Sequence, residues 1–113
     1  MKLDSAVFYT NDLAKVVAFY QNISGFKINY IQDGQFASFI FENSAKLGLK
    51  RTKEEREVPG HQTAFLTVTD IERFYEAIKN KTAIHKELVE QDWSKNFSIL
   101  DPDGNKIQFV EYT

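Results

Sequence analysis

This chain of 113 residues has no cysteine and only two histidines, the side chains most often used as soft metal ligands or in catalytic triads. The absence of cysteine excludes disulfides, thiolate metal ligands and cysteine nucleophiles from this sequence. Only two histidines are present, and neither belongs to a recognisable catalytic triad or phosphate-binding motif. His61 follows Pro59-Gly60, which favours a loop position, and it would share a face with Thr63 only if the next strand began early. His85 lies in an alternating segment, where we expect an exposed strand position.

A turn motif near the end of the chain positions the amide most relevant to chemistry. The motif reads Asp-Pro-Asp-Gly over residues 101–104. Its first Asp can accept a backbone N–H, Pro102 presets φ at the first corner, and Gly104 supplies a positive φ. The strand after this turn carries Gln108 and Glu111, which we expect on opposite faces because odd spacing along a strand reverses the side.

The elements around this hairpin repeat a plan found earlier in the chain. In each half, a strand-like run precedes a helical stripe with apolar residues at i, i+3, i+4 and i+7. The two stripes are related by an offset of 58 residues, from Leu13 to Ile71 and from Tyr20 to Ile78. Strand, helix and three further strands agree in order, which favours a true repeat over a coincidence of two amphipathic helices.

The repeat predicts one domain built from two strand–helix–strand–strand–strand modules. The modules cover residues 1–51 and 60–113, and a charged linker covers residues 52–59. The expected strands are residues 3–10, 27–31, 36–42, 46–50, 62–68, 84–90, 96–100 and 106–112.

Capping residues mark the predicted helix ends. Asn11 is the expected cap of a first helix that begins at Asp12, and Gly25 is the residue expected to stop it. Thr69 and Glu72 have the spacing of a capping box for the second helix.

The chain resembles the vicinal-oxygen-chelate superfamily, which includes glyoxalases, extradiol dioxygenases, fosfomycin-modifying enzymes and bleomycin-resistance proteins. The resemblance rests on the closing DPDGNKIQFVE at residues 101–111, the opening AVFYTNDLAKVVAFYQNISGF at residues 6–26, and the repeat. It implies an α+β fold in which two βαβββ modules form a curled mixed sheet around a cleft, with the helices on the convex side. It also implies a homodimer, because a single curled sheet leaves edges and apolar surface for a second copy to cover.

Metal-using members of this superfamily bind a divalent ion on the concave face of the sheet. The resemblance implies that the corresponding positions here are Ser5, Thr63 and Gln108, the last of which is usually Glu in those members. A further ligand would come from a middle strand of the first module, near Phe39, Phe41 and Glu42. Hydroxyls and a neutral amide are poor ligands for Zn²⁺, Fe²⁺ or Ni²⁺, so we expect neither a metal nor another cofactor.

Strand alternation predicts an apolar and aromatic cleft that contains a few hydroxyls and one amide. Aromatic rings there can stack on a planar ligand, and Gln108 can bond it through both ends of its amide. The candidate ligand-binding residues are Ser5, Val7, Tyr9, Phe39, Phe41, Thr63, Phe65, Thr67, Trp93, Gln108 and Val110. In the opposing interpretation, these aromatic side chains pack together and fill the cleft.

The favoured hypothesis is a metal-independent protein that holds an unknown small organic molecule, as the resemblance to bleomycin-resistance proteins implies. A metal-dependent lyase, transferase or dioxygenase is an alternative that requires His61, Glu42 and another acid to converge. Metal-free proton transfer by Tyr9 or an acid at the rim is another, and a non-catalytic interaction module with a filled cleft is the last.

Composition limits the partners and the location that these hypotheses allow. A net charge of -2 implies no general attraction to nucleic acid and a weak preference for cationic ligands. No apolar run approaches the ~18 residues of a membrane span, and no secretory signal is recognisable. We therefore expect no nucleic acid and no membrane partner, and the lack of cysteine fits a reducing cytoplasm.

Overall fold

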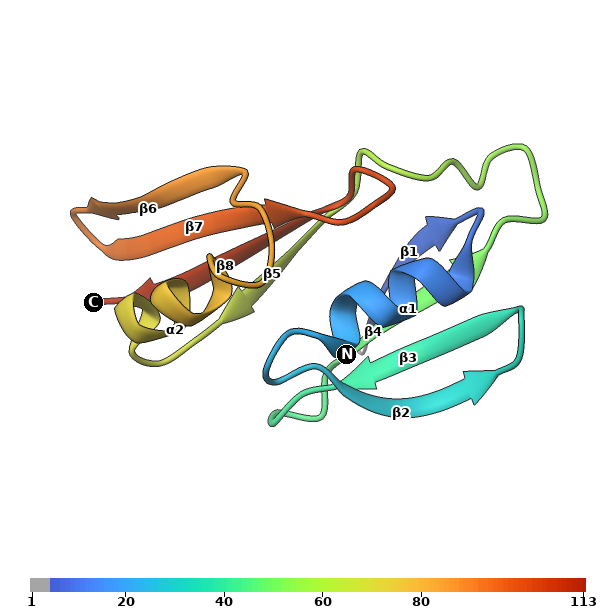
Figure 1. Cartoon of the computed structure of the whole chain (residues 1–113), viewed down its shortest axis with the longest axis horizontal. Coiled ribbons are helices and arrows are strands. Elements are labelled where there is room, and N and C mark those ends of the chain that lie inside the picture. Colours follow the sequence, from blue (N-terminus) through green and yellow to red (C-terminus); the bar gives the residue numbers. More distant parts are fainter. Residues whose placement is uncertain (1–4) are drawn as a thin grey trace, which may run out of the picture.

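The computed structural model describes residues 5–113, which fold into two modules with the same order of elements (Figure 1). The first module contains β1 (Ser5–Thr10), α1 (Leu13–Gln21), β2 (Lys27–Gln32), β3 (Phe36–Ile40) and β4 (Lys46–Arg51). The second contains β5 (Thr63–Thr67), α2 (Ile71–Ile78), β6 (Lys86–Gln91), β7 (Ser94–Leu100) and β8 (Lys106–Tyr112). The predicted α+β fold of two βαβββ modules is confirmed.

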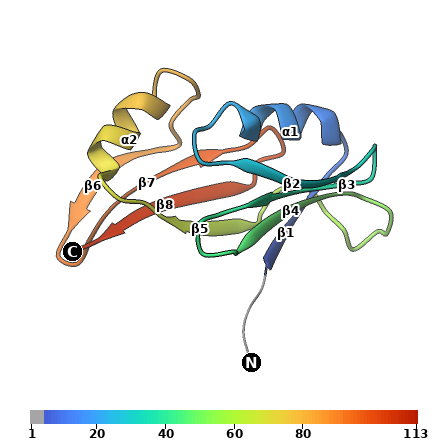
Figure 2. The same ribbon diagram turned by 90° about the horizontal axis from the view of Figure 1, so that it is seen from below.

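Each module forms its own four-stranded mixed sheet. The strand orders are β1-β4-β3-β2 and β5-β8-β7-β6, in which the first strand of each module runs parallel to the last and the other neighbours are antiparallel. Both helices cover the same side of the two sheets, which do not close on themselves (Figure 2). We call the side turned away from α1 and α2 the open face.

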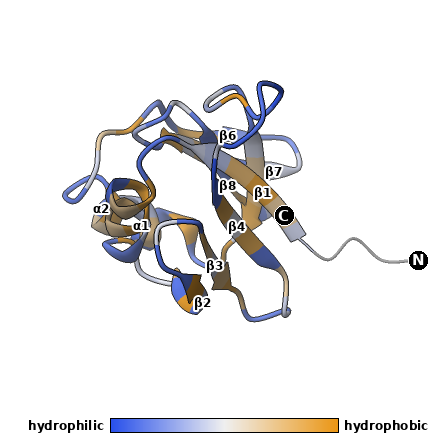
Figure 3. Ribbon diagram, turned by 90° about the vertical axis from the view of Figure 1, so that its right-hand side faces the viewer, coloured by the Kyte–Doolittle hydropathy of each residue, from blue (hydrophilic) through white to orange (hydrophobic). Residues whose placement is uncertain are grey.

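An aromatic core fills the space between each sheet and its helix. In the first module, Tyr20 of α1 stacks on Phe26 with ring centroids 5.1 Å apart, and both rings contact Phe39 of β3 edge-on. In the second module, Phe97 and Phe109 lie beneath α2 with centroids 5.0 Å apart. Hydrophobic residues concentrate in the helices and strands, whereas the connecting loops are mainly hydrophilic (Figure 3). Neither helix of the described residues is long and apolar enough to cross a membrane.

The start of α1 lies one residue later than predicted. Asp12, not Asn11, is the N-cap, and its Oδ1 accepts a hydrogen bond from the Lys15 N–H at 3.2 Å. The helix ends at a C-cap residue, Asn22, and Gly25 with φ 96° lies in the turn that follows. The glycine therefore redirects the chain toward β2 rather than capping the helix itself.

The predicted capping box of α2 is wrong, because a strand supplies the cap. Asp70 is the N-cap, with φ 50° and no side-chain capping bond. The carboxylate of Glu111 in β8 instead accepts hydrogen bonds from the Asp70 and Ile71 N–H groups at 3.0 and 3.2 Å. Glu111 therefore points toward the helix, opposite to Gln108, as the odd spacing predicts. A tertiary contact replaces the local Thr69–Glu72 interaction.

A buried hydrogen bond joins the two modules. The Tyr20 hydroxyl in α1 donates to Oδ2 of Asp101, in the turn between β7 and β8, at 2.8 Å. Oδ1 of Asp101 accepts the N–H groups of Asp103 and Asn105 at 2.9 and 3.0 Å, and Gly104 has φ 90°, as the turn motif predicts. Burial raises the pKa of both Asp101 and Tyr20.

A side-chain amide makes the second connection between the modules. Oε1 of Gln62 accepts the Tyr9 N–H at 3.2 Å, and Nε2 of Gln62 donates to the Val7 carbonyl at 2.9 Å. The amide therefore occupies the place of a neighbouring strand at the free edge of β1. The backbone N–H of Gln62 donates to Oδ1 of the fully buried Asn105, which links this contact to the Asp101 turn.

The connection between the modules is ordered by a buried carboxylate. Oε1 of Glu57 accepts the N–H groups of Lys53 and Glu54 at 2.7 and 3.1 Å, and Oε2 pairs with Nζ of Lys50. These hydrogen bonds, led by the one from Lys50, lower the pKa of Glu57 to about 2. At the end of the same segment, a Cβ on Gly60 would lie 2.7 Å from the Asp103 carbonyl oxygen, so only glycine fits there.

Tyr20→Phe should lower the free energy of unfolding by about 1.5–3 kcal/mol, because it leaves a buried carboxylate without one donor. Urea unfolding followed by far-UV circular dichroism measures this change. Tyr75→Phe is the matched control: Tyr75 is a half-buried helix residue whose ring meets Phe97 at 4.9 Å, and no described residue hydrogen-bonds to its hydroxyl. Equal losses in the two variants would contradict a role for the Tyr20–Asp101 bond.

Glu57→Gln should remove a pH-dependent part of the stability. The folded pKa of Glu57, about 2, lies below the ordinary value of 4.5, so its contribution is complete above pH 4.5 and is lost as pH falls toward 2. Unfolding free energies measured between about pH 2 and pH 6 should therefore show a shallower acid decline in this variant than in the parent. Glu55→Gln, at an exposed neighbour, is the control and should keep the parent's slope.

Candidate functional site

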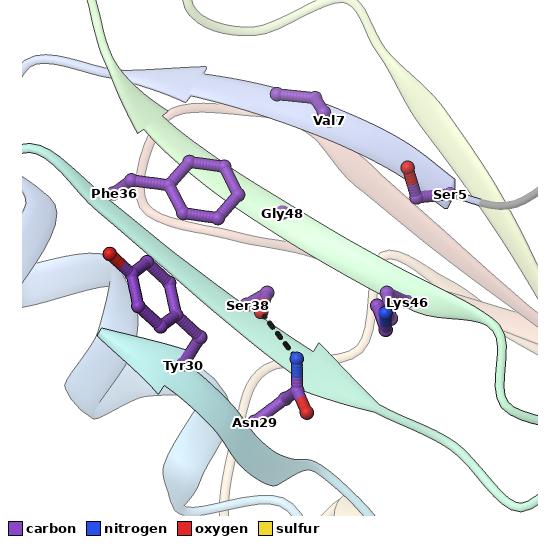
Figure 4. A pocket seen from close by; sticks show the side chains of 8 residues that line it. All are labelled: Ser5, Val7, Asn29, Tyr30, Phe36, Ser38, Lys46 and Gly48. Atoms are coloured by element: carbon purple, nitrogen blue, oxygen red, sulfur yellow. Dashed lines mark hydrogen bonds between the residues drawn. The ribbon is translucent and has the colours of Figure 1, made fainter. Parts of the chain in front are cut away.

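The open face of the first module contains a pocket of about 250 Å³ (Figure 4). It spans all four strands of the sheet, and both its floor and its walls come from that sheet. The lining residues are Ser5, Val7, Asn29, Tyr30, Phe36, Ser38, Lys46 and Gly48. We call this hollow the module-1 pocket.

A glycine in the middle of β4 creates the floor of the module-1 pocket. Strand pairing puts Val7, Gly48, Ser38 and Tyr30 in one row across β1, β4, β3 and β2. A Cβ on Gly48 would lie 3.0 Å from the Phe36 ring and 3.3 Å from a Val7 methyl group. Because Gly48 has no side chain, the Phe36 ring can lie over the strand, and space remains beside it.

The walls of the pocket combine aromatic and polar groups. The rings of Tyr30 and Phe36 have centroids 6.3 Å apart and an interplanar angle of 44°. The pairing of β2 is irregular between Ile28 and Tyr30, and at this point Nδ2 of Asn29 donates to the Ser38 hydroxyl at 3.2 Å. Such a surface can stack on a planar molecule and offer it several hydrogen bonds.

A second hollow, of about 350 Å³, lies at the seam between the modules. Most of its lining is apolar, and it shares Ser5 and Lys46 with the module-1 pocket. The other lining residues are Ala6, Phe41, Ala45, Leu47, Thr63, Ala64, Phe65 and Leu66. The two hollows therefore meet at the end of the first sheet where Ser5 pairs with Lys46.

The residues predicted for a cleft are divided among several places. Ser5 and Val7 line the module-1 pocket, and Ser5, Thr63 and Phe65 line the seam hollow. Tyr9 lies farther along β1, where Nζ of Lys50 is 5.9 Å from its ring centroid.

Four further predicted residues belong to the second module and line neither hollow: Thr67, Trp93, Gln108 and Val110. Thr67, Gln108 and Val110 share the open face there, since Thr67 pairs with Val110 and Gln108 pairs with Phe65. Trp93 is exposed in the turn between β6 and β7 and stacks on Tyr112 at 6.0 Å, beyond both hollows.

The prediction that Phe39 lines a cleft is wrong, because Phe39 is fully buried beneath α1. Phe41 also packs on the helix side, against Phe26 at 5.2 Å, but it lines the seam hollow. The open-face positions of β3 are Phe36, Ser38 and Ile40, which pair with Lys50, Gly48 and Lys46. The segment FASFIF carries phenylalanine on both faces, so hydrophobic alternation alone does not determine which side is buried.

Six lining residues of the module-1 pocket are absent from the sequence-based candidates: Asn29, Tyr30, Phe36, Ser38, Lys46 and Gly48. One sequence signal pointed toward them. A glycine inside a strand often marks a place where another group approaches the backbone, and Gly48 is such a residue.

Ser5, Thr63 and Gln108, which occupy the positions of the metal ligands in the superfamily that the sequence resembles, do not fit a divalent cation. Gln108 donates through Nε2 to Oδ1 of Asn96 at 2.9 Å, and Asn96 in turn donates to Ser94 and Gln91 at 3.3 Å. Gly48 pairs with Val7 as Gln108 pairs with Phe65, so the first module has no side chain at the matching place in its last strand.

No other group of side chains compensates for these positions. Among residues 5–113, no three His, Asp or Glu side chains come together as metal ligands. His61 is exposed with φ 65° just before β5, and Glu42 lies in the turn after β3. These two side chains therefore do not come together with another acid to form the metal site that a metalloenzyme of this family would need. His85 is exposed just before β6.

Comparison with known proteins supports the same architecture. A model of the Glyoxalase/Bleomycin resistance protein/Dioxygenase superfamily matches residues 2–109. No curated protein is similar enough in sequence to match the chain. A virulence protein from Salmonella typhimurium has a TM-score of 0.80 at 22% identity, covering 100% of this chain and 98% of that one.

Two further solved structures show the range of the likeness. TioX from Micromonospora sp. ML1 has a TM-score of 0.80 at 16% identity, with 100% of each chain covered. A lactoylglutathione lyase from Agrobacterium tumefaciens has a TM-score of 0.76 at 19% identity, with 97% of this chain and 92% of that one covered. At such identities, these likenesses establish a shared fold and leave the ligand to be argued from the site.

Proposed function

The chain belongs to the Glyoxalase/Bleomycin resistance protein/Dioxygenase superfamily, and on this basis we propose that it binds a small organic molecule without a metal ion. The ligand is planar, at least in part, and lies on the open face of the first module. Binding, rather than bond breaking, is the proposed activity, since the side-chain hydrogen bond between described residues of the pocket joins Asn29 to Ser38, and an amide does not activate a hydroxyl as a base would.

The observation that carries this proposal is the composition of the module-1 pocket. Two aromatic rings, Tyr30 and Phe36, stand beside a glycine floor, and the Asn29–Ser38 pair supplies polar groups next to them. A hollow with apolar surfaces and a few convergent polar groups is the usual form of a small-molecule site. Its volume of about 250 Å³ suits a one-ring or two-ring compound.

The second module supports a binding role that does not need a metal. Gln108 is held in a chain of amide and hydroxyl hydrogen bonds with Asn96 and Ser94. This network uses an N–H of the Gln108 amide and holds the side chain on the open face of the second module, outside the module-1 pocket. The proposal therefore assigns Gln108 to this hydrogen-bonded network and not to a metal site.

Native mass spectrometry of the untagged protein, purified from its own host without chelators, tests this function. The expected spectrum contains a metal-free protein that retains an organic adduct. Phe36→Leu removes one ring of the pocket and should lower the adduct-bearing fraction several-fold, because ring stacking contributes about 0.5–1.5 kcal/mol. Val58→Ala, at an exposed apolar residue of the linker, is the control and should retain the adduct as the parent does.

Two outcomes would contradict the proposed function. One divalent ion per chain would return the protein to the metal-dependent members of its superfamily. Equal retention of the adduct by Phe36→Leu and the parent would exclude the module-1 pocket as its site.

We also propose that two copies associate through the open face. Several large apolar side chains there are exposed, including Phe65 at 69% and Tyr30 at 53%, and contact with a second copy would remove them from water. A second copy has the same two modules, so a two-fold axis can bring the aromatic residues of one chain over the pocket of the other. Such a pair would also enclose a ligand that a single open sheet leaves half exposed.

Light scattering coupled to size-exclusion chromatography should give twice the chain mass of 13.1 kDa. Phe65→Asp places a charge on the proposed contact and should shift the mass toward one chain while the circular dichroism spectrum is unchanged. Val58→Asp, at an exposed residue of the linker, is the control. Leu100→Asp is not used, because Leu100 is 38% exposed and pairs with Lys106, so a new carboxylate there would meet a lysine. A concentration-independent mass of one chain for the parent protein would refute the dimer.

A further inference from the structure

We infer that the module-1 pocket selects planar organic anions, with Lys46 as the group that recognises the negative charge. This inference rests on the proposed binding function and names the class of ligand. A carboxylate attached to a one-ring or two-ring aromatic system is the simplest member of that class.

At strand positions with a registered partner, the open face carries lysines and no acidic residue. Lys46 pairs with Ser5 in β1 and with Ile40 in β3, and Ile40 pairs in turn with Lys27, so both lysines share one open-face row. The same reasoning applied to every strand of the described chain gives the lysines of the open face as Lys27, Lys46, Lys50, Lys86 and Lys106. Only Lys50 among them has an ion-pair partner within residues 5–113, and that partner is Glu57.

The acidic residues of the strands lie elsewhere. Glu90 and Glu111 share a row with Lys95, and Glu111 faces α2, so this row belongs to the helix side. Glu87 lies within the irregular pairing of β6 and shares no registered row with the open face. The remaining described acids are in helices, turns and the linker. The chain as a whole has a charge of -2, but the one charged side chain that lines the module-1 pocket, among the described residues, is Lys46.

This local charge reverses the weak preference for cationic ligands that the net charge predicts. The interaction of a bound ligand with nearby charges falls off with distance and is screened over about 10 Å in ordinary buffer, so the nearest side chains decide it. Lys46 is half-buried and lines both hollows, which puts it closer to a bound molecule than the acids of the helix side.

The layout of the pocket separates a ring site from a charge site. Phe36 and Tyr30 stand at one end, Lys46 and Ser5 stand at the other, and the hydrogen-bonded Ser38–Asn29 pair lies between (Figure 4). A planar ligand whose ring rests on the aromatic end would extend its anionic group toward the ammonium of Lys46. The Ser5 hydroxyl, in the neighbouring strand position, can donate a second hydrogen bond to the same group.

A pair of matched probes tests this assignment. We would titrate isotope-labelled protein with 2-naphthoate and with 2-naphthamide, which share one ring system and differ in charge, and follow backbone amide shifts. Naphthoate should bind more tightly, with the largest shifts at residues 36–38 and 46–48. Lys46→Gln should weaken naphthoate binding about fivefold or more and leave naphthamide binding within about twofold.

Lys106→Gln is the control, because Lys106 pairs with Thr63 as Lys46 pairs with Ser5 but does not line the pocket. This variant should bind both probes as the parent does. If Lys46→Gln and Lys106→Gln weaken naphthoate equally, or if Lys46→Gln weakens both probes equally, the assignment of Lys46 is overturned while the pocket itself stands. If neither probe shifts the pocket amides of the parent, the binding function and the inference both fail.

Discussion

The arrangement of the two modules depends on one buried carboxylate. Asp101 organises its own turn through two backbone N–H groups and, with its other oxygen, accepts the hydroxyl of Tyr20 from the first module. Asn105 extends this contact to Gln62, whose amide bonds the free edge of β1. Within residues 5–113 the two sheets share no strand pairing, so these polar contacts and the apolar core common to both modules hold one module against the other. The seam hollow, with Lys46 in its lining, lies where the two modules meet.

Two modules with the same backbone plan have acquired different open faces. Gly48 leaves room for the Phe36 ring to lie over the centre of the first sheet, whereas Gln108, at the matching place in the second, contributes an amide that is hydrogen-bonded to Asn96. The first module therefore has a hollow where the second has a hydrogen-bonded side chain. The two open faces are accordingly asymmetric, although the scaffold is a repeat.

Most of the fold could be predicted from the sequence because local signals and the repeat agreed. The apolar stripes, the Asp-Pro-Asp-Gly turn and the alternation of β8 each specify their structure within a few residues. The site was harder to predict, because the order FASFIF gives phenylalanine to both faces of β3, and only its pairing with Gly48 shows that Phe36 faces the pocket. The cap of α2 was missed for a related reason, since Glu111 is distant from that helix in sequence.

The last strand divides its residues between two duties by strict alternation. Ile107, Phe109 and Glu111 are committed to the core and the helix cap, whereas Gln108, Val110 and Tyr112 alternate with them on the open face. Within the second set, Tyr112 is exposed, whereas Val110 is buried and Gln108 is hydrogen-bonded to Asn96, so the three positions differ in what a replacement would cost. An inserted or deleted residue would exchange the two sets, turn the core residues outward and unfold the module. The strand therefore tolerates a changed side chain far better than a changed length.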